Sequence, residues 1–255
     1  MIKLYTNGGL GDAVMSLAKI HAKYSSKEIK DIKLTHIRGR QDKLNEVIRE
    51  FYDSQGIQNQ IVSIPKVYFN NEADKSDIKD LGTFLGMGWS EKNSDGDPDS
   101  WEINPFPKIN TKSVTFSEEP PTHKPYILLH PSSGSHKNMK WFDEDELGNF
   151  LKKYPDTIIT GSSEFSSFIS LVGFRNNYYN KTSITELINI ISSVDIIIAT
   201  EGFVPYIGAM LKKKVYCLSE NMPAIIERKH PAWDFHLING LEDVDRGRDL
   251  KNNKK

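Results

Sequence analysis

Short apolar runs alternate with longer amphipathic segments along most of the chain. In the first half, the apolar runs predict strands near residues 2–5, 33–37 and 61–64, and the amphipathic segments predict helices near 12–24 and 41–52. Strands that alternate with helices in this way are typical of βαβ units, in which neighbouring strands run parallel. The pattern therefore predicts an α/β fold that begins with a small, Rossmann-like domain.

The same alternation returns in the second half of the chain. From residue 126 a strand, a loop rich in Ser and Gly, a helix and another strand follow one another. Further on, the pattern predicts a strand that ends at Ala199, a helix over 205–211 and a strand over 215–218. These elements predict a second Rossmann-like domain over 126–240, with a parallel sheet and flanking helices.

The segment between the two regular regions is rich in Asn, Ser, Asp, Gly and Pro. Such residues favour turns and loops, so we expect a first domain over 1–115 with an insertion near 86–115, and then a linker over 116–125. The insertion has two interpretations, an ordinary surface loop or a lid over a substrate. The last residues, 241–255, are charged and are expected to form a frayed tail.

Composition narrows the classes of partner. The chain of 255 residues has 33 Lys and Arg against 34 Asp and Glu, so it has no general attraction for nucleic acid or for anionic membrane. A nucleic-acid partner would need a local basic patch. Its one cysteine, Cys217, lies in an apolar run and is expected to be a buried structural thiol in a reducing compartment. Because no apolar run approaches the roughly 20 residues of a membrane span, we expect a cytoplasmic protein without an integral membrane segment, with peripheral association left open.

Loops that follow strands are the first places to search for a ligand site, because parallel sheets bind ligands beyond the carboxyl ends of their strands. The first such loop, "TNGGLGDA", contains Gly9 and Gly11, which let the backbone approach a ligand. A dinucleotide fingerprint would need its third glycine where Val14 stands, and the lysine of a P-loop is missing. Asp12 has two interpretations here, a helix cap or a functional acid.

The second loop, "HPSSGSHKNMKW", brings hydroxyls and positive charge to the end of a strand. Ser132, Ser133, Lys137 and Lys140 are suited to a phosphate group, although a solvated polar loop has the same composition. Its two histidines have no carboxylate or cysteine nearby to complete a ligand set, so no metal site is expected.

Two later loops have a similar position in the pattern. Glu164 follows "TGSS", where a carboxylate can accept hydrogen bonds from ribose hydroxyls or answer a helix dipole. Thr200, Glu201 and Gly202 precede the predicted helix over 205–211, with backbone donors facing a phosphate. The sequence contains neither G-x-S-x-G nor H-E-x-x-H, so the familiar hydrolase chemistries have no support.

The order of these loops resembles that of the heptosyltransferase-like enzymes of glycosyltransferase family 9, which have the two-lobed GT-B fold. The resemblance covers about two thirds of the chain, chiefly residues 1–25 and 125–220. "GGLGDAV" is similar to a family turn whose aspartate acts as catalytic base, which would give Asp12 that role. The serine loop would bind the diphosphate through Ser132 and Ser133, with Lys137 or Lys140 supplying charge.

The resemblance extends to the two later loops. "GSSE" is similar to a family element that would make Glu164 a ribose ligand. "TEGFVP" corresponds to the family pattern D-[ST]-G-x-x-H but keeps only its glycine, Gly202, while Thr200, Glu201 and Pro205 replace the other three residues.

The resemblance implies an inverting, metal-independent glycosyltransferase that needs no cofactor and uses a nucleotide sugar as co-substrate. The acceptor would be a saccharide or another molecule with a hydroxyl group. The altered "TEG" motif leaves open a nucleotide-sugar-binding or nucleotide-binding protein of the same fold without turnover. A third interpretation, a Rossmann-type oxidoreductase, predicts binding of a nicotinamide cofactor.

Overall fold

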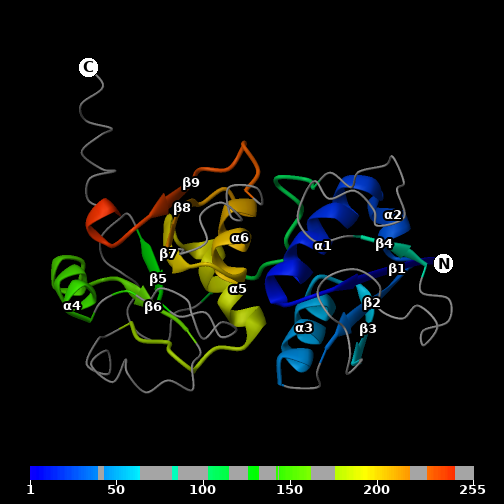
Figure 1. Ribbon diagram of the computed structural model, residues 1–255, viewed down its shortest axis with the longest axis horizontal. Helices are drawn as coiled ribbons and strands as arrows, with labels where there is room; N and C mark the ends of the chain where they lie inside the picture. The colour runs from blue at the N-terminus through cyan, green and yellow to red at the C-terminus, as the bar shows by residue number, and fades with distance from the viewer. Residues whose placement is uncertain are drawn as a thin grey trace. The chain divides into compact units, whose positions relative to one another are not determined.

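The computed structural model describes residues 1–39, 43–63, 82–85, 103–114, 126–131, 142, 144–161, 176–218 and 229–244. The chain divides into two compact units, one of residues 1–110 with 227–232 and one of residues 111–226 with 233–255. Each unit has its own sheet, and every strand pair in both sheets is parallel (Figure 1). The predicted α/β fold with two parallel sheets and flanking helices is confirmed.

The first unit contains a four-stranded sheet in the order β3-β2-β1-β4. Its strands are β1 (Ile2–Asn7), β2 (Ile32–Arg38), β3 (Gln58–Ser63) and β4 (Thr83–Phe84), and its helices are α1 (Leu10–Lys23), α2 (Ser26–Ile29) and α3 (Lys43–Ser54). The three strands and two helices predicted in this half are present, with bounds that differ by a few residues. The sequence did not reveal β4, because two residues are too short for a recognisable pattern.

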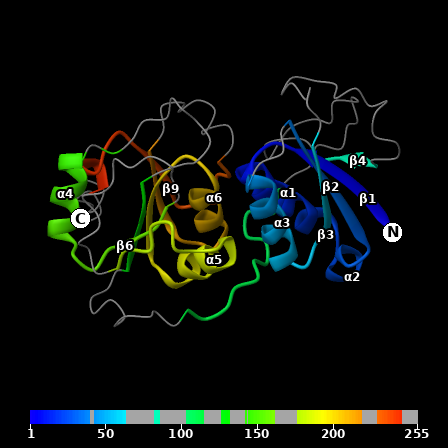
Figure 2. The ribbon, with the colours of Figure 1, turned by 90° about the horizontal axis from the view of Figure 1, so that it is seen from below.

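Helix α1 is the central helix of the first unit. Eight consecutive residues from Ala13 to Ile20 are buried, and the helix contacts β1 and α3 (Figure 2). Ser25 caps the short helix α2 by accepting a hydrogen bond from the Glu28 N–H, which stabilises the start of this helix. In the pairing of β1 with β2, Thr6 lies opposite His36.

The second unit contains a five-stranded sheet in the order β6-β5-β7-β8-β9. Its strands are β5 (Ile127–His130), β6 (Ile158–Ile159), β7 (Ile196–Thr200), β8 (Lys214–Leu218) and β9 (Phe235–Ile238), and its helices are α4 (Glu144–Lys153), α5 (Ile184–Ser193) and α6 (Phe203–Met210). All five residues of β7 are buried, as expected for a central strand covered on both faces.

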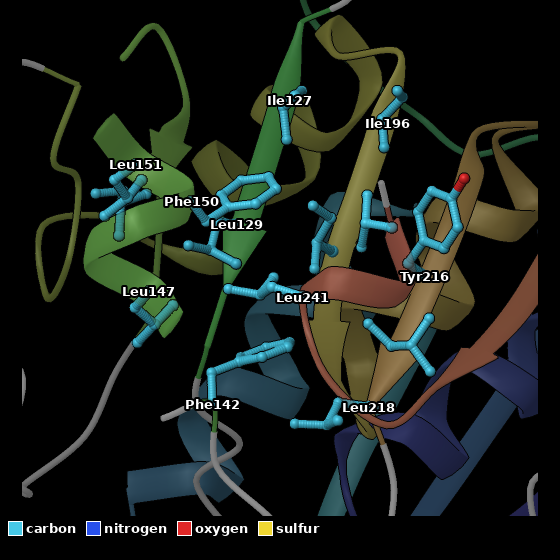
Figure 3. Packing of buried hydrophobic residues seen from close by; sticks show 14 residues of the cluster. Ile127, Leu129, Phe142, Leu147, Phe150, Leu151, Ile196, Tyr216, Leu218 and Leu241 are labelled. Atoms are coloured by element: carbon cyan, nitrogen blue, oxygen red, sulfur yellow. The ribbon is translucent and has the colours of Figure 1, made fainter. Parts of the chain in front are cut away.

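Alternate residues of the central strands pack on opposite faces of this sheet. On one face, side chains such as Leu129 and Ile198 form a core with Phe142 and Phe150 (Figure 3). On the other face α6 lies against β7 and β8 so closely that a Cβ atom at Gly208 would collide with Ile197. Burial on both faces explains why these strands read as continuous apolar runs.

The core of the second unit extends past the predicted domain boundary at residue 240. Leu241 and Val244 are buried in this core, and they lie three residues apart on one helical turn. These two apolar side chains pack against the sheet, so the core of the second unit includes the start of the segment that was predicted as a charged tail. Residues 245–255 and the predicted linker over 116–125 lie outside the described residues.

Part of the predicted insertion packs as an ordered segment of the first unit. Ile103 and Ile109 are buried, and the Asn104 N–H donates to the Ala18 carbonyl on α1 over 3.1 Å. Contacts place the division between the units after Asn110. Among the helices that the structure describes, none is long and apolar enough to cross a membrane.

Candidate functional site

Strand order identifies one special position in the first sheet. The chain runs from β1 outward to β2 and β3, and then returns to β4 on the other side of β1. In an open parallel sheet, ligands bind beyond the carboxyl ends of the strands where the order reverses in this way. Two features lie at this switch point. One is the turn after β1, which consists of Gly8 and Gly9, and the other is the start of α1, which contains Asp12.

Asp12 is held in the turn by backbone contacts. Its carboxylate oxygen Oδ2 accepts a hydrogen bond of 2.7 Å from the Gly9 N–H. Gly8 has φ +110°, and a Cβ atom there would collide with the Asp12 carboxylate. Only glycine satisfies both conditions, so Gly8 brings the backbone against the carboxylate. Sequence reasoning selected Gly9 and Gly11 but missed Gly8, although the double glycine was the signal.

The position of Asp12 in the structure bears on both of its interpretations, a helix cap and a functional acid. Gly9 occupies the N-cap position, and Asp12 is the third residue of α1, where its carboxylate reaches back to the N-cap N–H. Gly11 lies inside the helix, not in the turn. Asp12 therefore supports the helix start, and it does so while half-buried at the switch point of the sheet.

Buried side chains from β2 and α3 support the Gly8 turn from inside the unit. The Nε2 atom of His36 lies 3.1 Å from the Gly8 carbonyl oxygen, and its Nδ1 atom lies 3.0 Å from the Tyr52 hydroxyl. Arg38 donates to the same Gly8 carbonyl over 3.4 Å. We call His36, Arg38 and Tyr52 the turn-support residues. Sequence reasoning missed all three, and the available signal was the histidine in the predicted strand over 33–37.

The electrostatics of this group follow from its burial. Burial lowers the pKa of His36 to about 4, the hydrogen bond to Gly8 opposes this shift and the positive charge of Arg38 adds to it. The imidazole is therefore neutral at pH 7. Burial also raises the pKa of Tyr52, a hydrogen bond with Ser16 opposes the shift, and the negative charge of Asp12 adds to it. Tyr52 is thus neutral, and its hydroxyl interacts electrostatically with the charge of Asp12.

The second sheet has its own switch point, between β5 and β7. The chain passes from β5 to β6 on one side and then to β7 on the other side of β5. Thr200 ends β7, and Glu201 and Gly202 lead into α6. The Glu201 N–H donates to the Leu218 carbonyl over 3.0 Å, which fixes this turn against β8.

The turn after β7 has two features that suit a ligand. Gly202 has φ 153° and ψ −154°, a conformation that is essentially restricted to glycine, and it caps α6 without a side-chain hydrogen bond. The Thr200 hydroxyl oxygen is buried and has no hydrogen-bond partner among the residues described. Helix α6 begins at Phe203, two residues earlier than predicted, so Pro205 is its third residue, where no intrahelical N–H bond is lost.

The structure places only some of the predicted site residues. It brings Gly9 and Asp12 together at one switch point, and Thr200, Glu201 and Gly202 together at the other. The remaining predicted residues follow β5 and β6 in the chain but lie outside the described residues: Ser132, Ser133, Lys137, Lys140 and Glu164.

Two further expectations concern metal and thiol chemistry. Within the described ranges, no three His, Cys, Asp or Glu side chains gather into a group that could hold a metal ion. Independence from metal nevertheless stays a prediction. Cys217 is a buried free thiol, and burial followed by the charge of Glu201 raises its pKa. The expected burial of this thiol is confirmed.

The fold is similar to those of several solved structures over most of the chain. The E. coli heptosyltransferase WaaC with ADP is 10% identical, with a TM-score of 0.56 over 99% of this chain and 100% of that chain. E. coli ADP-heptose lps heptosyltransferase II is also 10% identical, with a TM-score of 0.55 over 93% and 90% of the two chains. A glycosyl transferase family 9 structure from Veillonella parvula is 8% identical, with a TM-score of 0.52 over 99% and 90%.

The sequence itself is remote from these proteins. No protein-family model matches the chain, and no curated protein sequence matches it. At identities of 8% to 10% the similarity shows the fold alone. The chain has the GT-B-type fold of the heptosyltransferases, as the order of its loops predicted.

Proposed function

We propose that this protein is a glycosyltransferase that moves a sugar from a nucleotide-sugar donor to a hydroxyl acceptor. The observation that carries the proposal is the placement of Asp12 at the switch point of the first sheet, in a chain with the heptosyltransferase fold. A carboxylate that is oriented by a backbone N–H and lies beyond a strand end is suited to general-base chemistry. The acceptor is a saccharide or another molecule with a reactive hydroxyl.

The proposed reaction is a single displacement. Asp12 takes the proton from the acceptor hydroxyl while that oxygen attacks the anomeric carbon, and the bond to the nucleotide diphosphate breaks. One displacement inverts the configuration of that carbon. The Gly9 N–H fixes the orientation of the carboxylate, so little reorganisation is needed before proton transfer.

We assign the donor to the switch point of the second sheet. The solved relatives include a WaaC structure with ADP and another with ADP-2-deoxy-2-fluoro heptose, so an adenosine diphosphate sugar is the first donor class to test. The Thr200 hydroxyl and the backbone at Gly202 would face the diphosphate. Ser132, Ser133, Lys137 and Lys140 are proposed to stabilise the leaving group without a metal ion, and Glu164 to bind the ribose.

A second candidate is a nucleotide-sugar-binding or nucleotide-binding protein of the same fold without turnover. The observation that favours it is Glu201, an acidic side chain in the turn that we assign to the diphosphate. A carboxylate there repels a phosphate unless a positive group lies between them. This candidate predicts donor binding that does not depend on Asp12 and no transfer by the wild-type protein.

The test compares the wild type with Asp12→Asn and with Asp31→Asn, an exposed acid of the same unit. Binding of ADP-heptose, UDP-glucose and GDP-mannose is measured by thermal shift, and release of the nucleotide diphosphate is measured with and without saccharide acceptors. We expect Asp12→Asn to keep binding and to lose about 10²- to 10⁴-fold in kcat, and Asp31→Asn to match the wild type. Equal activity of wild type and Asp12→Asn would refute the base assignment.

Inversion at the anomeric carbon and independence from metal are tested by separate measurements. The coupling constant of the anomeric proton in the product, measured by NMR, distinguishes inversion from retention. Activity that persists in excess EDTA supports metal independence, whereas loss of activity that Mg²⁺ restores contradicts it.

A further inference from the structure

His36 lies at a position where a polar side chain is unfavourable, because it has no exposed surface and stands in the middle of a parallel sheet. Burial of an imidazole costs free energy unless both ring nitrogens find partners. Both do: Nε2 contacts the Gly8 carbonyl oxygen and Nδ1 contacts the Tyr52 hydroxyl. An aliphatic residue would fill the same strand position without this desolvation cost. The presence of a histidine with two hydrogen bonds therefore needs an explanation.

The partners fix the tautomer of the ring. A carbonyl oxygen only accepts hydrogen bonds, so Nε2 carries the proton and donates it to Gly8. Nδ1 is then the acceptor, and the Tyr52 hydroxyl donates to it. The charged and titratable groups near His36 are Arg38 on its own strand, Tyr52 from α3 and, through Tyr52, Asp12 of α1.

Gly8 connects the buried hydrogen bonds of the unit with the carboxylate of Asp12. The Gly8 carbonyl is bound from inside the unit by His36 and by Arg38. The α-carbon of the same residue lies so close to the Asp12 carboxylate that a Cβ atom would collide with it. The next residue, Gly9, donates its N–H to the carboxylate. Any displacement of the Gly8 peptide therefore displaces the surface against which Asp12 rests.

From this chain of contacts we infer that His36 is a positioning residue for Asp12. As a neutral donor it holds the Gly8 carbonyl, and through the Gly8–Gly9 turn it fixes the orientation in which Asp12 meets an acceptor hydroxyl. Tyr52 holds the ring in the donating tautomer. The inference rests on the proposed function, because it assumes that Asp12 is the general base.

The experiment compares His36→Leu with His36→Gln. Leucine fills the site but donates nothing, whereas the glutamine amide can place an N–H where Nε2 donates. We expect His36→Leu to lower kcat by about tenfold to a hundredfold, the range that follows from misplacing a reacting group. The KM for the nucleotide sugar should stay unchanged, because the donor is assigned to the other unit, and His36→Gln should recover most of the lost kcat.

A matched control is His21→Gln, which changes a half-buried histidine on α1 of the same unit and should match the wild type in kcat. Amide hydrogen exchange gives a readout apart from activity. The Gly9 N–H should exchange faster in His36→Leu than in the wild type, while amides in the centre of β1 and β2 keep their protection.

Imidazole ¹⁵N shifts of the wild-type protein keep the inference testable even where His36→Leu does not fold. They should show Nε2 protonated and Nδ1 unprotonated between pH 5.5 and 8, and a ring protonated at Nδ1 alone would overturn the inference. Equal loss of kcat in both His36 variants would also overturn it, since rescue by the donor would be missing. If Asp12→Asn keeps full activity, the assignment of Asp12 as the base fails first, and the tautomer and the Gly9 exchange still report whether His36 holds the turn.

Discussion

Burial of His36 predicts that acid destabilises the first unit. Burial is the main cause that lowers the pKa of His36 from 6.5, the ordinary value of a histidine, to about 4 in the folded protein. Between these values the unfolded chain binds a proton that the folded chain rejects, so the free energy of unfolding falls as pH falls. The contribution is complete above about pH 6.5, is lost through this window and changes no further below about pH 4.

The magnitude follows from the size of the shift. A difference of about 2.5 in pKa lowers the free energy of unfolding by about 3 kcal/mol in the limit of low pH. About 2 kcal/mol of this should be lost between pH 7 and pH 4.5, since the folded ring is still mostly neutral at pH 4.5. His21 adds to the loss, because burial and then Lys108 lower its pKa as well. A comparison of variants is therefore needed to isolate His36.

The assay is urea unfolding at pH 7 and at pH 4.5, followed by hydrogen exchange and mass spectrometry. Peptides from residues 2–38 report on the first unit, and peptides from 127–218 report on the second, so the two units are measured separately. His36→Gln cannot titrate, so its loss of stability between the two pH values should be smaller than that of the wild type by about 2 kcal/mol. An equal pH dependence in both proteins would refute the reasoning.

Two other substitutions test the switch points. Gly202→Ala forces a side chain into a conformation that is essentially restricted to glycine, so we expect a loss of about 1 to 3 kcal/mol in stability of the second unit and weaker binding of ADP-heptose by thermal shift. Gly148→Ala, where a Cβ atom meets nothing within 4 Å, is the control, and equal effects would contradict the assignment. Lys19 is fully buried and donates to the Leu85 carbonyl over 2.6 Å, so Lys19→Ala should lower the unfolding free energy of the first unit by about 3 kcal/mol in urea. The exposed Lys27→Ala should change it by less than about 0.5 kcal/mol, and a similarly small effect at Lys19 would show that its buried bond is not needed.

The candidate site was predictable from sequence only where neighbours in the chain are also neighbours in space. Asp12 and Gly9 lie on one turn, so a glycine pattern before a helix was enough to select them. The partners of that turn come from elsewhere, since His36 is 28 residues from Gly8 in the chain. Nothing local in the sequence pairs them, because the contact depends on the register of β1 with β2.

By itself, the sequence determined the α/β class, most of the strands and helices, and the candidate loops, because apolar periodicity and glycine turns are local properties of the chain. The tertiary structure alone decided the strand orders and with them the two switch points, since pairing among parallel strands depends on crossovers that no local pattern encodes. It also decided that Leu241 and Val244 belong to a core and that buried His36 and Lys19 have partners. Burial is a property of the packed chain, so no local pattern of the sequence shows that a polar residue such as His36 supports a site.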